Sequence, residues 1–194
     1  MRTKLEYMSN AWKHFKTISK HKRIVMINCI KAGQIKRGLL HDNSKFGPTE
    51  FFSSVKYYQG NRSPIDAEKE DKGYSMAWQH HKGHNPHHWE YWIDNLGSYS
   101  NTPIKIPYEY VVEMVCDWIG AGKVYTENWT QHDTLKYYKK VRGERIIHPT
   151  TEKLILALLD ALDFGGLEYF YWKAKHSKDD YETGYMNKNY NGSL

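Results

Sequence analysis

The sequence predicts an all-α protein, a compact bundle of about six to eight helices in a single domain of 194 residues. Apolar residues recur at a spacing close to 3.6 along most of the chain, which is the period of a helix with one buried face. Proline and glycine stand at the ends of these segments, and no segment shows a convincing strand alternation. We expect the core to span residues 9–165 and residues 176–194 to form a flexible tail.

The ends of the expected helices are marked by residues that start or stop helices. The first helix ends at Gly33, Pro48 and Pro86 each take the first position of a later helix, and Pro149 precedes another. The expected helices span residues 9–33, 34–43, 48–58, 74–82, 86–94, 107–125, 131–141 and 150–163, and the polar segments 59–73 and 95–107 are expected to be loops.

Charge and cysteine usage limit the class of protein. The net charge is +6, with +9 in residues 1–45 and −3 in the remainder, which is compatible with a phosphate-rich or nucleic-acid partner and equally with a solvated helix face. No apolar run approaches the roughly 20 residues of a membrane span, and no secretory signal is visible. Cys29 and Cys116 fall in expected helices, so we expect reduced core cysteines and a cytoplasmic protein.

Histidines and carboxylates form the main chemical signal. The stretch "AWQHHKGHNPHHWEYW" at 77–92 holds five histidines, His14 and His21 lie two helical turns apart, and "HD" occupies 41–42. A carboxylate buried on a helix needs a partner, and a metal ion is one such partner. Incidental polar residues are the alternative reading. The whole set favours a site for one or two divalent transition ions, Mn, Fe, Ni, Co or Zn, rather than calcium.

The order His, His-Asp, His, His-His, Asp on an all-α scaffold resembles the HD-domain superfamily of metal-dependent phosphohydrolases. The motif "HDNSK" at 41–45 resembles the His-Asp-x-x-Lys of the HD-GYP branch, but Asn43 and Ser44 replace Ile-Gly and the Gly-Tyr-Pro element is missing. The motifs "LLHDNSKF", "AWQHHKGHNPHHWEYW" and "YVVEMVCDW" are more closely similar to a family of small bacterial and phage proteins, a domain of unknown function. That similarity covers about residues 10–160 and brings no established activity.

The superfamily resemblance implies roles for individual residues. Asp42 would bridge two ions and act with Lys45 in catalysis, Lys45 would meet the substrate phosphate, and Glu113 would orient a ligand histidine. His21 is the reserve for His14, and one of His80 and His81 would be a ligand. The implied metal ligands are His14, His41, Asp42, His80, His81, His87, His88 and Asp117, and the implied phosphate-binding residues are Lys45, Arg62 and Lys82.

The resemblance therefore predicts a phosphoric ester hydrolase with a small phosphorylated, nucleotide-type substrate and no membrane partner. Tyr57, Tyr58 and Trp89 are candidates for stacking a base or for the core. Two alternatives stay open: a mixed-valent di-iron oxygenase that uses the same ligands, and a non-catalytic module that binds a nucleotide or nucleic acid. Self-association into a homo-oligomer is also left open.

Overall fold

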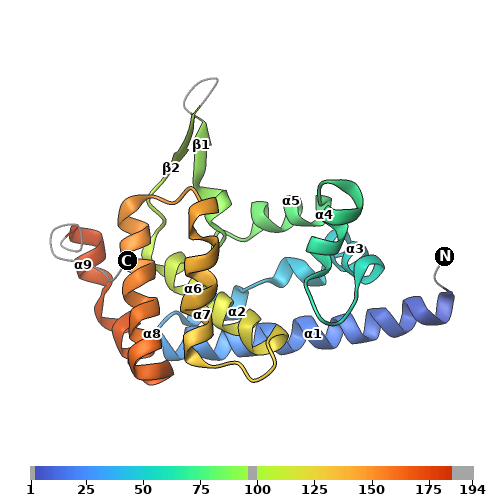
Figure 1. Ribbon diagram of the computed structural model, residues 1–194, viewed down its shortest axis with the longest axis horizontal. Coiled ribbons are helices and arrows are strands. Elements are labelled where there is room, and N and C mark those ends of the chain that lie inside the picture. The colour runs from blue at the N-terminus through green and yellow to red at the C-terminus, as the bar shows by residue number, and fades with distance from the viewer. Residues whose placement is uncertain (1–2, 96–99, 185–194) are drawn as a thin grey trace.

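The computed structural model describes residues 3–95 and 100–184, and in this part of the chain it confirms an all-α helical bundle with one small antiparallel hairpin (Figure 1). Three short 3-10 helices, Asn43–Phe46, Trp89–Trp92 and Arg142–Glu144, link longer elements. The helices are α1 Lys4–Lys31, α2 Ile35–Leu40, α3 Pro48–Tyr57, α4 Pro64–Lys72, α5 Met76–His84, α6 Tyr108–Tyr125, α7 Gln131–Val141, α8 Pro149–His176 and α9 Lys178–Thr183, and the strands are β1 Ile93–Asn95 and β2 Asn101–Pro103.

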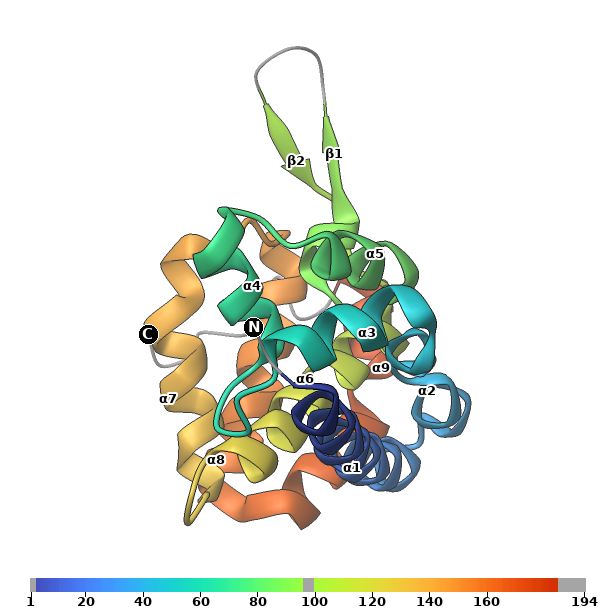
Figure 2. The ribbon, with the colours of Figure 1, turned by 90° about the vertical axis from the view of Figure 1, so that its right-hand side faces the viewer.

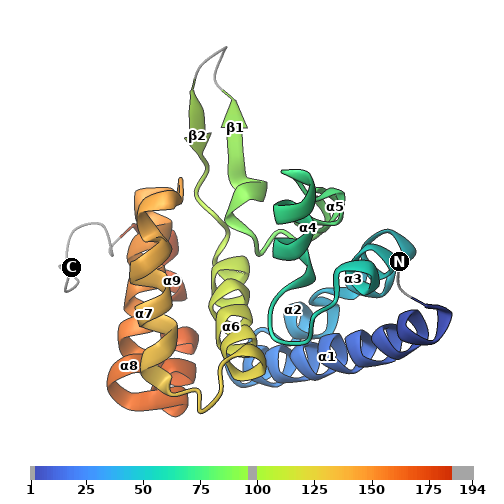
Figure 3. The same cartoon turned by 45° about the vertical axis from the view of Figure 1, so that its right-hand side comes forward.

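Helix α6 occupies the centre of the bundle. It packs on α1, α2, α7, α8 and α9, and Figure 3 shows it between the α7–α8 pair and the segment from α2 to α5. Its residues Val111, Val115 and Ile119 are fully buried in the apolar core, together with Leu158 of α8. The same helix carries Glu113 and Asp117, so it joins the apolar core to the polar interior described below.

The crossing of α1 and α6 is unusually close at Gly120. A Cβ atom at this position would lie 2.5 Å from Cγ2 of Val25 and 3.4 Å from the ring of His21. Only a residue without a side chain allows this approach. The glycine thereby sets the spacing between the two helices that carry His21 and Asp117.

The start of the first helix and segment 59–73 differ from the expectation for local reasons. Helix α1 begins at Lys4 rather than residue 9, because Thr3 and Glu6 form a reciprocal capping box. Segment 59–73, expected as a loop, contains α4, which lacks an apolar stripe and is held by contacts of Glu68 with Lys72 and Ser75.

The segments expected as a helix at 86–94 and a loop at 95–107 contain the hairpin instead. Asn85 does not begin a helix at residue 86: it is the C-cap of α5, and its side-chain amide donates to the carbonyl of His81 and to the hydroxyl of Ser44. The chain then makes a short 3-10 helix and enters β1, and the hairpin projects from the bundle (Figure 2). Apolar periodicity does not report such a side-chain contact.

The core also extends past residue 165. Helix α8 continues through a kink at Gly166, whose φ of 67° favours glycine, and its second half buries Phe170 and Ala174. Tyr181 of α9 is also buried, so part of the expected tail is packed structure, while residues 185–194 lie outside the described residues. Cys29 and Cys116 are buried free thiols. None of the described helices is long and apolar enough to cross a membrane.

Candidate metal centre

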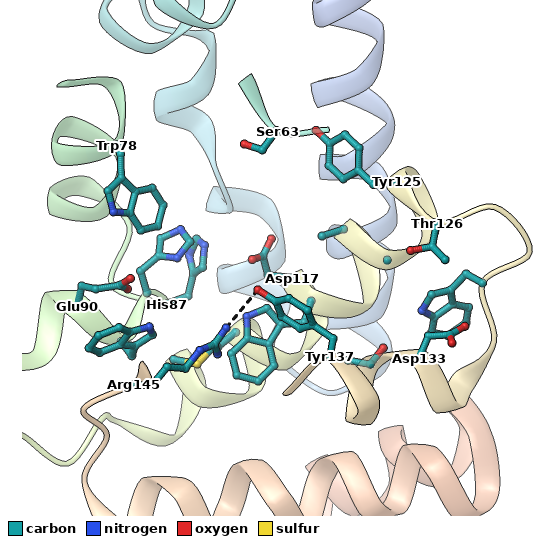
Figure 4. A pocket seen from close by; sticks show the side chains of 18 residues that line it. Ser63, Trp78, His87, Glu90, Asp117, Tyr125, Thr126, Asp133, Tyr137 and Arg145 are labelled. Carbon is teal, nitrogen blue, oxygen red and sulfur yellow. Dashed lines mark hydrogen bonds between the residues drawn. The ribbon is translucent and has the colours of Figure 1, made fainter. Parts of the chain in front are cut away.

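Histidines and carboxylates from four parts of the chain meet inside the bundle. Helix α1, the turn after α2, the end of α5 with the following turn, and α6 each contribute side chains. Figure 4 shows His87 and Asp117 on two sides of the adjoining pocket. The residues brought together are His21, His41, Asp42, His81, His87, His88, Glu113 and Asp117, and three groups among them could hold a metal ion.

The first group, which we call the helix site, consists of His21, His41, Asp42 and Asp117. Nε2 of His21 lies 2.9 Å from Oδ1 of Asp117, and Nε2 of His41 lies 3.4 Å from the same oxygen. Oδ2 of Asp42 is 3.3 Å from Nε2 of His41 and 3.6 Å from Nε2 of His21. Atoms that bind one ion at about 2.1 Å stand about 3.0–3.4 Å apart in octahedral or tetrahedral geometry. The four atoms lie close to these separations and are therefore candidate ligands of a single ion.

The second group, which we call the loop site, consists of Asp42, His81, His87 and His88. Oδ1 of Asp42 lies 3.4 Å from Nε2 of His81 and 3.5 Å from Nε2 of His87. Nε2 of His88 lies 2.8 Å from Nε2 of His81. Three imidazole nitrogens and one carboxylate oxygen are a donor set suited to a transition metal.

Asp42 belongs to both sites and presents a different oxygen to each. Its backbone is left-handed, with φ of 52°, a conformation that Asp and Asn tolerate better than other residues with a side chain. This conformation follows α2 directly and leaves the carboxylate only 1% exposed. The geometry is that of a carboxylate able to bridge two ions.

Two further carboxylates hold the ligand histidines in orientation. Oε1 of Glu113 accepts from Nδ1 of His41 at 2.9 Å and lies 3.2 Å from Nδ1 of His87, so one oxygen orients a histidine of each site. Oε2 of Glu50 accepts from Nδ1 of His81 at 2.8 Å. In both cases the Nε2 atom is left for an ion. The third group of possible ligands, His41, His87 and Glu113, is therefore better explained as support for the other two.

The ionisation of the two aspartates fits a site for cations. Burial acts to raise the pKa of Asp42 and of Asp117, but neighbouring histidines, and Lys45 for Asp42, hold each pKa well below its usual range. Burial lowers the pKa of His81 and His88, which keeps these rings neutral. Within the described chain, Oδ1 of Asp42 and Nε2 of His87 are buried without a hydrogen-bond partner. Such atoms are costly unless something binds them.

The structure separates the histidines that the sequence left as alternatives. His21, rather than His14, lies in the helix site, and His14 packs instead against the rings of Phe51 and Tyr58. His81, rather than His80, lies in the loop site. Nδ1 of His80 contacts Oε1 of Glu50 at 2.7 Å.

The residues proposed for phosphate binding lie in three different environments. Nζ of Lys45 is 2.5 Å from Oδ2 of Asp42, at the edge of the centre. The guanidinium of Arg62 pairs with both carboxylate oxygens of Glu70 at 2.6 Å, away from the ligands. Lys82, half-buried on α5, belongs to none of the ligand groups and does not line the pocket beside them. Only Lys45 is positioned at the centre.

A pocket of about 470 Å³ adjoins the centre, and His87, His88 and Asp117 form part of its wall. Its other lining residues include Trp118, Trp129, Tyr137 and Arg145, none of which the sequence identified. No sequence motif marks these residues as parts of a site, and they come together only through the packing of α6 and α7. Glu50 was also missed, because only the packing of α3 on α5 brings it to His81.

The chain belongs to the family described as "Family of unknown function (DUF5662)", which matches residues 10–161. This range contains every residue of the two sites. Comparison with curated proteins and with solved structures finds no match.

Proposed function

We propose that this member of the family is a metal-dependent phosphoric ester hydrolase with two ions held side by side. The observation that supports this most strongly is the carboxylate of Asp42, whose two oxygens face two separate sets of ligands. Two ions bridged by one carboxylate are typical of enzymes that cleave phosphate esters by in-line displacement. The donor set of imidazole and carboxylate suits Mn, Fe, Ni, Co or Zn.

Divalent ions bound there would supply Lewis acidity, which lowers the pKa of water and polarises a phosphoryl oxygen. In the reaction, a water oxygen bonds to phosphorus, the ester P–O bond breaks and the leaving oxygen takes a proton. With ions bound, Asp42 and Asp117 would offset part of their positive charge, and Glu113 would keep His41 and His87 oriented toward them.

Lys45 is the residue proposed to hold the substrate phosphate. Its ammonium group neutralises part of the charge of Asp42. Burial acts to lower the pKa of Lys45, but Asp42 and Asp117 raise this pKa above its ordinary value. These carboxylates favour the cationic form of Lys45. From this position it stabilises the negative charge that grows on the phosphoryl oxygens.

Metal content and ester hydrolysis test the proposal together. Protein purified without a histidine tag should contain between one and two equivalents of transition metal, and Mn should raise phosphate release from nucleotides or a generic phosphodiester. Less than about 0.2 equivalents, with no uptake or thermal stabilisation on loading with Mn, Fe or Zn, would contradict the metal centre. Bound iron with oxygen consumption and no phosphate release would instead identify the di-iron oxygenase.

A further inference from the structure

The pocket beside the metal centre is larger and more aromatic than a phosphate group requires. Its volume of about 470 Å³ lies in the range of pockets that bind small organic molecules. Besides the metal ligands, its wall contains the rings of Trp78, Trp89, Trp118, Trp129, Tyr125 and Tyr137. An aromatic wall is suited to a flat ring, because rings stack in offset or edge-to-face arrangements.

The aromatic residues of this wall are not simply core residues. Trp118 is half-buried, and Tyr137 is 48% exposed. Both have part of their surface free for a ligand, in contrast to the fully buried Tyr138 behind them, on which Trp118 stacks. The wall therefore has a fixed inner layer and an accessible outer layer.

Arg145 is the cation of this wall. Its guanidinium lies 4.7 Å from the ring centroid of Trp118, and it donates a long hydrogen bond of 3.3 Å to the hydroxyl of Tyr137, drawn in Figure 4. No ion pair to Arg145 is found among the described residues, whereas Arg142 pairs with Glu152 at 2.5 Å. The aromatic contacts hold the guanidinium in place and leave N–H donors available.

Unsatisfied polar atoms are concentrated around the same pocket. Of the ten buried side-chain nitrogen and oxygen atoms without a hydrogen-bond partner in the described chain, five belong to residues that line it. They include Nη1 of Arg145, Nε1 of Trp129 and Oε2 of Glu90. Buried groups of this kind cost free energy. A ligand with both acceptor and donor atoms would give them partners after small side-chain rotations.

We infer that the substrate carries a flat heteroaromatic ring that binds in this pocket, with Arg145 donating to an acceptor on the ring. The inference rests on the proposed hydrolase function, because it places the phosphate of the same molecule at the metal centre. Arg145 is then a specificity-determining residue, and Trp118 supplies the surface that orients both the guanidinium and the ring. Glu90 accepts from an N–H of the ring.

Probes that carry only one half of such a substrate separate the pocket from the metal centre. Calorimetric titration of the metal-loaded protein would use adenosine, guanosine, cytidine and uridine as ring probes, and ribose 5-phosphate as a phosphate probe without an aromatic ring. At least one nucleoside should bind, and Arg145→Gln should weaken it by about 10-fold or more, as expected for the loss of a charge-assisted hydrogen bond. Ribose 5-phosphate should bind equally well to both proteins.

Arg37→Gln is the matched control, because Arg37 is also half-buried and also lies on an aromatic ring, 4.8 Å from the centroid of Tyr110, but outside the pocket. It should change no affinity. If Arg145→Gln fails to fold, Arg145→Lys keeps the charge but not the flat donor array and should still weaken nucleoside binding.

Two results would overturn the inference: no nucleoside binds, or nucleosides bind the wild type and the Arg145 variant equally. Failure of ribose 5-phosphate to bind the metal-loaded protein would instead contradict the proposed hydrolase. Nucleoside binding that depends on Arg145 would still support the pocket in that case.

Discussion

The two candidate metal sites share a carboxylate but are built on different supports. The helix site takes His21 and Asp117 from α1 and α6, long helices that pack on each other and on the apolar core. The loop site takes His81 from the nine-residue helix α5, and His87 and His88 from the turn that follows it. His21 and Asp117 are fixed by helix packing, while His81, His87 and His88 are fixed mainly by side-chain contacts of Glu50, Asn85 and Glu113.

This difference has a physical consequence. Packed helices hold their side chains in place without an ion, because separating them would expose apolar surface. A turn held by a few hydrogen bonds opens at a lower free-energy cost. We therefore expect the helix site to be formed in the metal-free protein and the loop site to become ordered when its ion binds.

The largest effect is expected for Asp42→Asn, which affects both sites at once. The amide keeps the shape and tolerates the left-handed backbone, but it removes the charge that both ions share. Metal content should fall sharply, and hydrolysis should fall by about 1,000-fold or more with the fold intact. Mass spectrometry of bound metal and phosphate release measure the two effects.

The matched control for this change is Asp71→Asn, an exposed carboxylate on α4 that accepts from the hydroxyl of Tyr57. It should alter neither metal content nor activity. Equal metal and equal activity in the Asp42 and Asp71 variants would refute the shared carboxylate.

Single histidine variants separate the two sites. His21→Gln should lose the ion of the helix site and His88→Gln that of the loop site, so each protein should retain about one equivalent. His14→Gln and His84→Gln are the neighbouring controls and should retain as much metal as the wild type. If His14→Gln loses metal and His21→Gln does not, the assignment of the first histidine is reversed.

Substitution of the supporting carboxylates Glu113 and Glu50 should lower metal affinity less than loss of a ligand does. The two variants should also differ in which sites they affect. Glu113→Gln replaces the charged acceptor of His41 and His87 with a neutral amide, so it should weaken binding at both sites by about 10- to 100-fold. Glu50 contacts only His81 among the candidate ligands, so Glu50→Gln should weaken metal binding at the loop site alone. Competition with a chelator measures the two affinities. Loss of helix-site affinity in Glu50→Gln would show that the sites are not separately supported.

The smallest effect concerns His14, which lies outside both sites. Burial, together with the charge of Lys45, lowers its pKa from 6.5 to about 4. Below pH 6.5 the unfolded chain takes up a proton at this position that the folded chain does not, so stability falls as the pH falls. Between pH 7.5 and 5.5 this costs about 1 kcal/mol.

His14→Gln should therefore lose less stability over that interval than the wild type. Urea unfolding in the presence of a chelator measures the difference. An identical loss in both proteins would show that the ring of His14 is not shielded from water in the folded state.

Helices whose ends and buried face depend on residues close together in the chain could be predicted from the sequence. Helix α7 spans residues 131–141 as expected, since Thr130 and Asp133 form a capping box and an apolar stripe follows. Helix α4 was missed because its stability comes from polar pairs rather than from a periodic apolar face. The hairpin after α5 was missed because Asn85 ends α5, with its side chain bonded to His81 and Ser44, instead of starting a new helix.

In the candidate site, too, the sequence did not reveal what depends on contacts between distant residues. Asp117 stood out because a carboxylate between apolar residues needs a partner, and Asp42 because of its His-Asp motif; the structure brings the two together. His14 and His21 are two turns apart on one helix face, so periodicity cannot tell them apart. Their distances to α6 decide between them, and these depend on how two helices cross. Arg145 and Trp118 carry no sequence signature of a site at all.

The close crossing at Gly120 gives this position an importance that its chemistry does not suggest. Glycine has no donor atom, yet any larger residue would push Val25 and His21 away from α6 and so lengthen the distance from His21 to Asp117. In a survey of all single substitutions scored by function, position 120 would therefore be as intolerant as the ligands themselves. A variant that arose there naturally would look like a lost ligand, although every metal-binding side chain was still present.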